Sequence, residues 1–236
     1  MQKQHLSAMA LLSACCLNVC LSPGVRAKDN TLTEQEKATG WQLLFNGHDH
    51  TGWKCNTGKP IATPIEDGAL VPYKSGGYII IYDKQFGDFV LKCDVRWEAA
   101  HCNSGIFFRV EEPADPVNTG FEVQVMGGNQ TGKHEFGAIY DLEPNKVAAG
   151  KPTGQWNHVE ITCRGSRIQV NLNGQDVCSM NCEDFTRPGY CPDGQPHKYK
   201  LNGKPRAIKD FARKGYLGFQ DHGHKVWYKN VKILEL

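Results

Sequence analysis

The chain has 236 residues, of which 40% are hydrophobic and 22% are charged, and its 27 Lys and Arg residues are nearly matched by 25 Asp and Glu residues. This balance argues against a nucleic-acid partner, because such partners usually require a clear excess of basic residues. The length suits a single all-β domain with a core of its own.

The first 27 residues have the layout of a secretory signal peptide. Lys3 precedes an apolar run over residues 6–21, and Val25-Arg26-Ala27 resembles an A-x-A cleavage site. The run is short for a membrane span. We therefore expect residues 1–27 to be removed and the protein to be periplasmic or secreted. A lipid anchor is the alternative, because Leu12-Ser13-Ala14-Cys15 fits a lipobox in which Cys15 is acylated.

Residues 28–40 predict a short helical lead-in to the domain. Thr33-Glu34-Gln35-Glu36 has the pattern of a capping box, in which Thr33 accepts a hydrogen bond from the backbone at Glu36. Gly40 is placed to end the helix. The domain proper is then expected over residues 41–236.

From residue 41 onward, short runs rich in Val, Ile, Phe and Tyr recur between Gly, Pro and Asn clusters. The expected strands cover residues 78–82, 89–97, 105–109, 121–126, 159–164, 167–172, 216–220 and 226–234. Residues 164–167 and Asn173-Gly174 are expected to form hairpin turns. Strands with alternating faces in this number predict an all-β fold built as a two-sheet antiparallel sandwich.

Seven cysteines follow the leader, and an exported protein with such a set is expected to contain disulfides, with at least one thiol unpaired. They are Cys55, Cys93, Cys102, Cys163, Cys178, Cys182 and Cys191. None of their spacings completes a zinc site, so we interpret them as structural. Cys93 and Cys163 lie on the apolar sides of their strands, where a buried bridge or two free thiols would fit equally well.

Residues 181–210 interrupt the strand pattern with four prolines and several lysines. This composition favours a solvated surface insertion. A lid over a substrate is the alternative interpretation, because long irregular segments often carry function.

Alternation also predicts a polar face on one sheet. Glu122 and Gln124 lie opposite an apolar face of their strand, Gln220 ends a second strand that continues into His222, and a third strand runs from Asn103 to Arg109. If these strands are neighbours, Arg109, Glu122, Gln124, Gln220 and His222 share one surface. Such groups donate and accept hydrogen bonds as sugar hydroxyls require. A solvated outer face is the alternative for each of them.

The chain also contains an ordered set of motifs, which are Gly40-Trp41-Gln42-Leu43-Leu44-Phe45-Asn46-Gly47, Gly52-Trp53, Gly87-Asp88-Phe89, Asn103-Ser104-Gly105 with Arg109, Gly120-Phe121-Glu122-Val123-Gln124, Gly137-Ala138-Ile139-Tyr140, Trp156-Asn157, Leu172-Asn173-Gly174 and Gly218-Phe219-Gln220-Asp221-His222-Gly223. Together they resemble the 3-keto-disaccharide hydrolase family. The resemblance implies a jelly roll like those of concanavalin A-like lectins and glucanases, with a carbohydrate on the concave face. The chain departs from the family mainly in its cysteines and in residues 181–210.

The expected activity is that of a hydrolase or lyase that cleaves glycosidic bonds. Retaining glucanases of similar fold use two carboxylates, whereas the strand Glu122-Val123-Gln124-Val125-Met126 supplies one. The family name implies 3-keto-glycosides or 3-keto-disaccharides, whose ketone acidifies the proton on carbon 2. A base can then remove that proton, the group on carbon 1 can leave, and water can add. A non-catalytic carbohydrate-binding module on the same face is the alternative.

We expect Glu122 or His222 to be the base, with Arg109 and Gln124 holding the enolate oxygen. Asn103 and Gln220 are expected to orient sugar hydroxyls. Tyr140 and Asp141 complete the predicted substrate-binding set, and His134 with Asp141 is a second choice for the catalytic pair.

No cofactor or metal is expected. No glycine-rich loop that could hold a phosphate precedes a helix, which argues against a nucleotide. The acidic residues show no spaced metal-binding loop. The oxidation that makes the ketone must therefore occur on another enzyme, a sugar 3-dehydrogenase that acts upstream.

Overall fold

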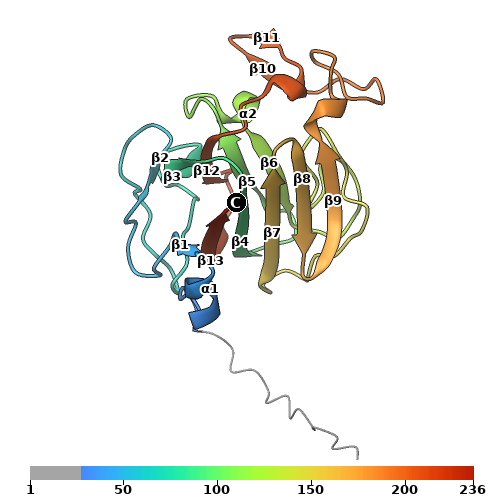
Figure 1. Cartoon of the computed structure of the whole chain (residues 1–236). Coiled ribbons are helices and arrows are strands. Elements are labelled where there is room, and N and C mark those ends of the chain that lie inside the picture. The colour runs from blue at the N-terminus through green and yellow to red at the C-terminus, as the bar shows by residue number, and fades with distance from the viewer. Residues whose placement is uncertain (1–27) are drawn as a thin grey trace, which may run out of the picture.

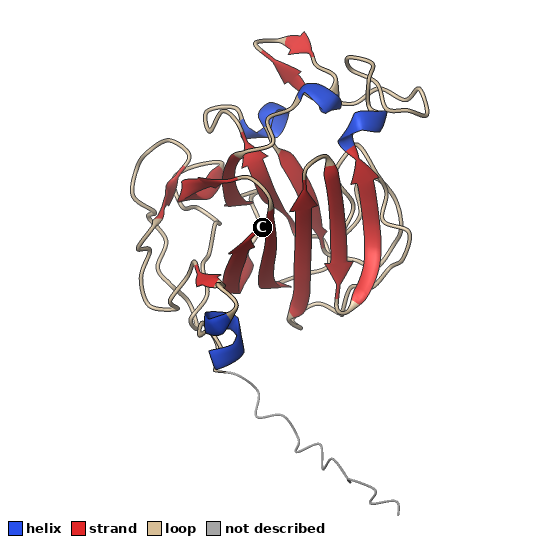
Figure 2. Ribbon diagram, in the orientation of Figure 1, coloured by secondary structure: helices blue, strands red, loops and turns tan. Residues whose placement is uncertain are grey.

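Two antiparallel β-sheets packed face to face form the body of the molecule in this computed structural model, which describes residues 28–236 (Figures 1 and 2). The predicted signal peptide and the lipobox at Cys15 lie outside the described residues. One sheet has the order β1-β13-β4-β7-β8-β9 and the other β2-β3-β12-β5-β6. The predicted jelly-roll sandwich is confirmed.

The described residues form thirteen strands, two α-helices and two 3-10 turns. The strands are β1 (Gln42–Leu43), β2 (Trp53–Cys55), β3 (Ile79–Phe86), β4 (Phe89–Trp97), β5 (Asn103–Val110), β6 (Phe121–Met126), β7 (Asn157–Arg164), β8 (Arg167–Leu172), β9 (Gln175–Asn181), β10 (Lys200–Leu201), β11 (Lys204–Pro205), β12 (Gly215–Gln220) and β13 (Val226–Glu235). The helices are α1 (Glu34–Ala38), α2 (Pro116–Thr119) and the 3-10 turns η1 (Cys182–Asp184) and η2 (Ile208–Asp210). In the part of the chain that the structure describes, none of these helices has the length and apolar character to cross a membrane.

Hydrophobic alternation explains most of the strands. β4, β6 and β8 begin and end at the predicted residues, and β4 alternates strictly between buried and half-buried positions. β9 was not predicted, because Val177 and Cys178 are buried in succession where the ladder to β8 shifts register. The turn between β8 and β9 is the expected one, since Asn173 and Gly174 both have positive φ angles, of 52° and 86°.

Aromatic side chains fill the space between the sheets. The rings of Phe219 on β12 and Tyr228 on β13 stack with centroids 4.0 Å apart, so they join one sheet directly to the other. Both residues are fully buried. Burial of such side chains contributes roughly 1.5–3 kcal/mol each to folding.

The lead-in helix α1 is attached to the six-stranded sheet. The predicted capping box is present: Thr33 Oγ1 accepts from the Glu36 backbone N–H at 3.1 Å, and Glu36 Oε2 accepts from the Thr33 N–H at 2.7 Å. The same carboxylate forms an ion pair with Lys232 of β13 at 2.8 Å. The cap therefore also holds residues 28–40 against the domain.

The seven cysteines of the described chain are all free and buried, so the expectation of disulfides is wrong for this structure. Cys93 pairs with Val159 and Cys163 pairs with Phe89 in the β4–β7 ladder, which separates the two thiols by roughly 13 Å along the strands. That distance is too long for a bridge. Burial raises the pKa of Cys163 and of Cys178 to about 12, so both remain protonated thiols that behave as small apolar groups.

Residues 181–210 are not simply a solvated insertion. They carry η1, η2 and the short hairpin β10–β11, which projects from one end of the sandwich in Figure 1. Phe185, Tyr199 and Ile208 from this segment are buried in the main hydrophobic core. The segment is therefore a packed part of the domain, and this packing directs one of its side chains toward the five-stranded sheet.

Candidate functional site

The polar face predicted from alternation exists on the five-stranded sheet. Gly105 of β5 pairs with Gln124 of β6, and its neighbour Ile106 pairs with Phe219 of β12. Because side chains alternate along each strand, Glu122, Gln124 and Gln220 point away from the aromatic core. All three are nevertheless buried. The structure thus brings these three residues together, as predicted, on a face of the sheet that is shielded from solvent.

Glu122 lies at the centre of this surface. Its side chain extends over Gly105, where an added Cβ would be 2.4 Å from Glu122 Oε1, so the glycine leaves space for the carboxylate. Lys198 Nζ donates to Glu122 Oε2 at 3.1 Å. Burial raises the pKa of Glu122, while Lys198 and, more weakly, His222 and His134 oppose that rise. The result is a carboxylate with one cation in direct contact.

Two tyrosines lie beside this carboxylate. Burial and the charge of Glu122 raise the pKa of Tyr78 to about 12, and the same two causes raise the pKa of Tyr140. Both phenols therefore keep their protons at neutral pH. The ammonium of Lys198 lies 4.1 Å from the centre of the Tyr140 ring, within the range of a cation–π contact.

Two amide side chains of this face have oxygen atoms that accept no hydrogen bond from the described residues. Gln124 Nε2 donates to Asn103 Oδ1 at 3.1 Å, and Gln220 Nε2 donates to the Tyr78 hydroxyl at 2.7 Å. The Oε1 atoms of Gln124 and Gln220 are buried without a hydrogen-bond partner among the described residues. Buried polar atoms are nearly always paired, so these two acceptors suit hydrogen-bond donors of a ligand.

The second predicted pair, His134 with Asp141, lies at the edge of the same site. His134 Nε2 is 3.3 Å from Asp141 Oδ1, and the imidazole ring lies 4.6 Å from the Tyr140 ring. Asp141 Oδ2 also accepts from the backbone N–H of Lys198 at 2.6 Å. His222 is exposed and acts on Glu122 through its charge. Both histidines are therefore near Glu122 without being buried with it.

Arg109 does not belong to this group, and its predicted position on the polar face is wrong. Phe107 pairs with Gly218 and Val110 pairs with Tyr216, so β5 has one residue more than β12 between these pairs. Arg109 occupies this bulge with a φ of 49°. The bulge interrupts the alternation and directs the side chain elsewhere.

The guanidinium of Arg109 instead joins the two sheets at one end of the sandwich. It donates to Gly87 O at 3.1 Å, to Gly165 O at 2.8 Å and to Asp88 Oδ1 at 2.8 Å. Its side chain has no exposed surface. Arg109 is thus bonded to the β3–β4 and β7–β8 turns rather than to the groups around Glu122.

With this geometry in hand, comparison with known proteins identifies the family. Residues 40–234 match the sequence profile of the 3-keto-alpha-glucoside-1,2-lyase-like domain. This chain belongs to that family. The predicted resemblance is therefore confirmed.

Relatives of this 3-keto-alpha-glucoside-1,2-lyase-like domain include a curated 3-keto-disaccharide hydrolase of Bacteroides thetaiotaomicron, which is 25% identical over 98% of this chain and 91% of its own length. A candidate glycosyl hydrolase from Parabacteroides distasonis is 31% identical, with a TM-score of 0.70, over 89% of this chain and all of the solved one. A second one from the same organism is 25% identical, with a TM-score of 0.65, over 83% of this chain and 99% of the solved one.

Two residues of the site were not predicted from the sequence of this family member. Lys198 comes from residues 181–210, where the sequence has no strand or helix period that would indicate the direction of a side chain. Tyr78 precedes β3 and follows two glycines. Its place at the start of an apolar strand was visible in the sequence, but the partner Gln220 is distant along the chain.

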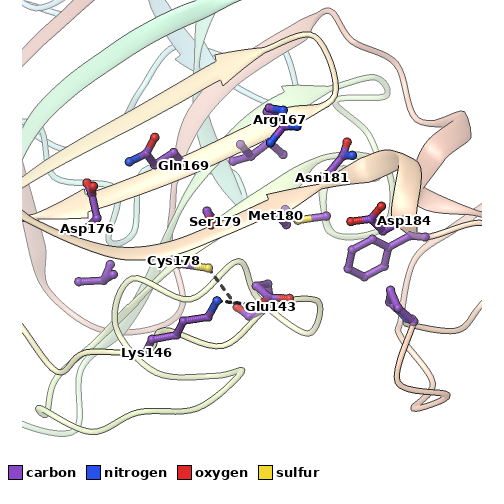
Figure 3. A pocket seen from close by; sticks show the side chains of 14 residues that line it. Glu143, Lys146, Arg167, Gln169, Asp176, Cys178, Ser179, Met180, Asn181 and Asp184 are labelled. Carbon is purple, nitrogen blue, oxygen red and sulfur yellow. Dashed lines mark hydrogen bonds and ion pairs between the residues drawn. The ribbon is translucent and has the colours of Figure 1, made fainter.

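A groove of about 780 Å³ lies elsewhere on the 3-keto-alpha-glucoside-1,2-lyase-like domain, along the edge strand β9 (Figure 3). Glu143, Lys146, Arg167, Asn181 and Asp184 are among its lining residues, and none of the predicted site residues is. The lining residues have no buried polar atom without a partner. The unpaired amides beside Glu122 therefore favour the polar face of the five-stranded sheet as the functional site.

Proposed function

We propose that this protein cleaves glycosidic bonds of sugars that carry a ketone on carbon 3, by elimination followed by hydration. The observation that carries the proposal is Glu122, a buried carboxylate in contact with one ammonium and flanked by amide acceptors without partners. The names of the Bacteroides and Parabacteroides relatives support cleavage of glycosides.

The proposed chemistry requires a single carboxylate. Glu122 takes the proton from carbon 2, and the electron pair of that C–H bond forms a C2=C3 double bond while the ketone becomes an enolate. The ketone then re-forms, the pair moves to make C1=C2, and the C1–O bond breaks. The leaving oxygen takes the proton back from Glu122. Water adds across C1=C2, so the net reaction is hydrolysis.

The absence of a second acid on β6 supports this route over ordinary two-carboxylate hydrolysis. Within Phe121–Met126, Glu122 is the one acidic residue, and the position two residues on is Gln124. A retaining glycosidase needs two carboxyl groups about 5–5.5 Å apart across the bond. A substrate already activated by a ketone has no such requirement.

The remaining predicted residues take binding roles in this proposal. Gln124 and Gln220 accept from sugar hydroxyls through their unpaired oxygens, and Asn103 positions the Gln124 amide. Tyr140 and Asp141 border the sugar beside Lys198. His222 is the alternative base.

The test is to incubate the protein with a 3-keto-disaccharide and with the same disaccharide unoxidised, and to follow release of 3-keto-glucose. We expect turnover of the oxidised sugar only. Glu122→Gln should lower kcat/KM by about 10²- to 10⁴-fold, the usual contribution of a general base. His222→Ala should remain close to the wild type.

Two results would contradict the proposal. Saturable binding of sugars without any product would indicate a carbohydrate-binding module. Undiminished turnover by both Glu122→Gln and His222→Ala would remove both candidate bases.

We also propose that the protein works in the periplasm or outside the cell and receives its substrate from a sugar 3-dehydrogenase. The apolar run over residues 6–21 and the cleavage site at Ala27 support export. Fractionation of the producing cells and N-terminal sequencing should find a chain that starts at Lys28. A lipidated chain that starts at Cys15 would replace this proposal with membrane anchoring.

A further inference from the structure

The sequence analysis expected Arg109 to be the cation that holds the enolate oxygen, whereas the structure places Lys198 beside Glu122. On the basis of the proposed function, we propose that Lys198 is a catalytic residue that keeps Glu122 ionised and then stabilises the enolate oxygen. The residue comes from the 181–210 segment, which the sequence-based hypothesis left out of the predicted site. This proposal therefore makes that segment part of the reaction centre.

The position of Lys198 is held on several sides. Its backbone N–H donates to Asp141 Oδ2 at 2.6 Å, and its ammonium contacts both Glu122 and the Tyr140 ring. The next residue, Tyr199, is buried in the core and donates its hydroxyl proton to Tyr140 O at 2.8 Å. The ammonium is thus held by a packed part of the domain, as a preorganised catalytic group requires.

The ammonium also lies on the accessible side of the carboxylate. The Lys198 side chain is 24% exposed, whereas that of Glu122 is 4% exposed. Lys198 is therefore the member of this ion pair that solvent reaches more easily.

Movement of charge during the reaction gives this ammonium two successive partners. Before proton transfer, the negative charge is on Glu122, next to Lys198. After Glu122 takes the proton from carbon 2, the charge is on the oxygen at carbon 3, and the ammonium can donate its hydrogen bond there. Glu122, Lys198 and the sugar together keep the same net charge throughout. The enolate can therefore form in a buried site without adding a charge to it.

Without the ammonium, a desolvated carboxylate favours its protonated form and cannot act as a base. The titratable groups whose charge acts on Glu122 or is affected by it come from several elements: Lys198 and Tyr199 of the 181–210 segment, His134 and Tyr140 after β6, Tyr78 before β3, His222 after β12 and Tyr228 of β13. Of these, Lys198 opposes the raised pKa of Glu122 most strongly. Activity needs ionised Glu122, so the rate should rise with pH through that pKa.

The experiment compares Lys198→Met, Lys198→Arg and the matched control Lys200→Met in the full protein. Lys200 is exposed and lies two residues further along the same segment. For each variant we would measure the pH dependence of kcat/KM with a 3-keto-disaccharide and, separately, exchange of the carbon 2 proton with D₂O by NMR. Circular dichroism and Tm report folding, and Lys198→Gln is the second neutral variant in case Lys198→Met does not fold.

We expect Lys198→Met to lose about 10²- to 10³-fold in kcat/KM, the usual effect of removing one oxyanion donor. Its rate should also begin to rise at a higher pH, because the pKa of Glu122 increases further. Lys198→Arg should retain the wild-type pH profile and part of the rate. It keeps the positive charge, but a planar guanidinium replaces the compact ammonium. Lys200→Met should match the wild type in every measurement.

The outcomes separate this inference from the proposed function. A wild type that neither exchanges the carbon 2 proton nor releases 3-keto-glucose would overturn both. An active wild type with a Lys198→Met variant within about threefold of it in kcat/KM and with an unmoved pH profile would overturn the role of Lys198 alone. A loss of activity shared by folded Lys198→Met and Lys200→Met would indicate a structural role for the segment and would also overturn it.

Discussion

Two buried charges on neighbouring strands of one sheet have opposite surroundings. Arg109 of β5 uses its three guanidinium nitrogens to bond Gly87 O, Gly165 O and Asp88. Glu122 of β6 has one ionic contact, with Lys198. The amides near Glu122 keep acceptors without partners, whereas the groups around Arg109 are bonded to it.

The difference separates a structural charge from a functional one. A buried charge whose nitrogens are each bonded to the protein offers little to a ligand, and it stabilises the fold that it joins. A buried charge with a partly exposed counterion and unsatisfied neighbours keeps capacity for a substrate. Arg109 and Glu122 are both charged residues on neighbouring strands. Their hydrogen bonds and ion pairs distinguish the structural residue from the functional one.

The largest expected effect is on stability, at Arg109. Arg109→Met should lower the free energy of unfolding by about 2–4 kcal/mol, because it removes a fully buried guanidinium, its ion pair with Asp88 and the link between the sheets. The folded fraction should keep its kcat. Urea denaturation checks this, with the exposed Arg167→Met of β8 as control. A stable variant that has lost kcat would contradict the comparison.

The next effect is on the position of Glu122. Gly105→Ala places a methyl carbon 2.4 Å from Glu122 Oε1, closer than the two atoms can approach. The carboxylate must move, and we expect kcat/KM to fall by about 10- to 100-fold. Gly87→Ala is the matched control, because its added carbon meets nothing nearer than Arg213 O at 3.9 Å. Equal activity of the two variants would show that the position of Glu122 over Gly105 is unimportant.

The smallest effect concerns one amide acceptor. Gln220→Met removes the unpaired oxygen and should raise KM by about three- to tenfold with little change in kcat, as expected for loss of one hydrogen bond that substrate and transition state share. Steady-state kinetics on a 3-keto-disaccharide checks this, with exposed Gln169→Met as control. A fall in kcat at unchanged KM would instead give Gln220 a role in the chemical step.

Most of the long strands and part of the site could be predicted because alternation carries that information. It placed Glu122, Gln124 and Gln220 on one face, where the register confirms them. It failed at Arg109, because a bulge depends on the partner strand and not on β5 alone. It also failed at Lys198, because tertiary packing sets the orientation of the side chains in residues 181–210.

The buried cysteines have a practical consequence for making the protein. Seven thiols occupy apolar positions in the described domain and no sulfur–sulfur bond links them there. Formation of this core requires no oxidant and no particular pairing of cysteines. Residues 28–236 can therefore reach the same structure in a reducing cytoplasm as in an oxidising compartment.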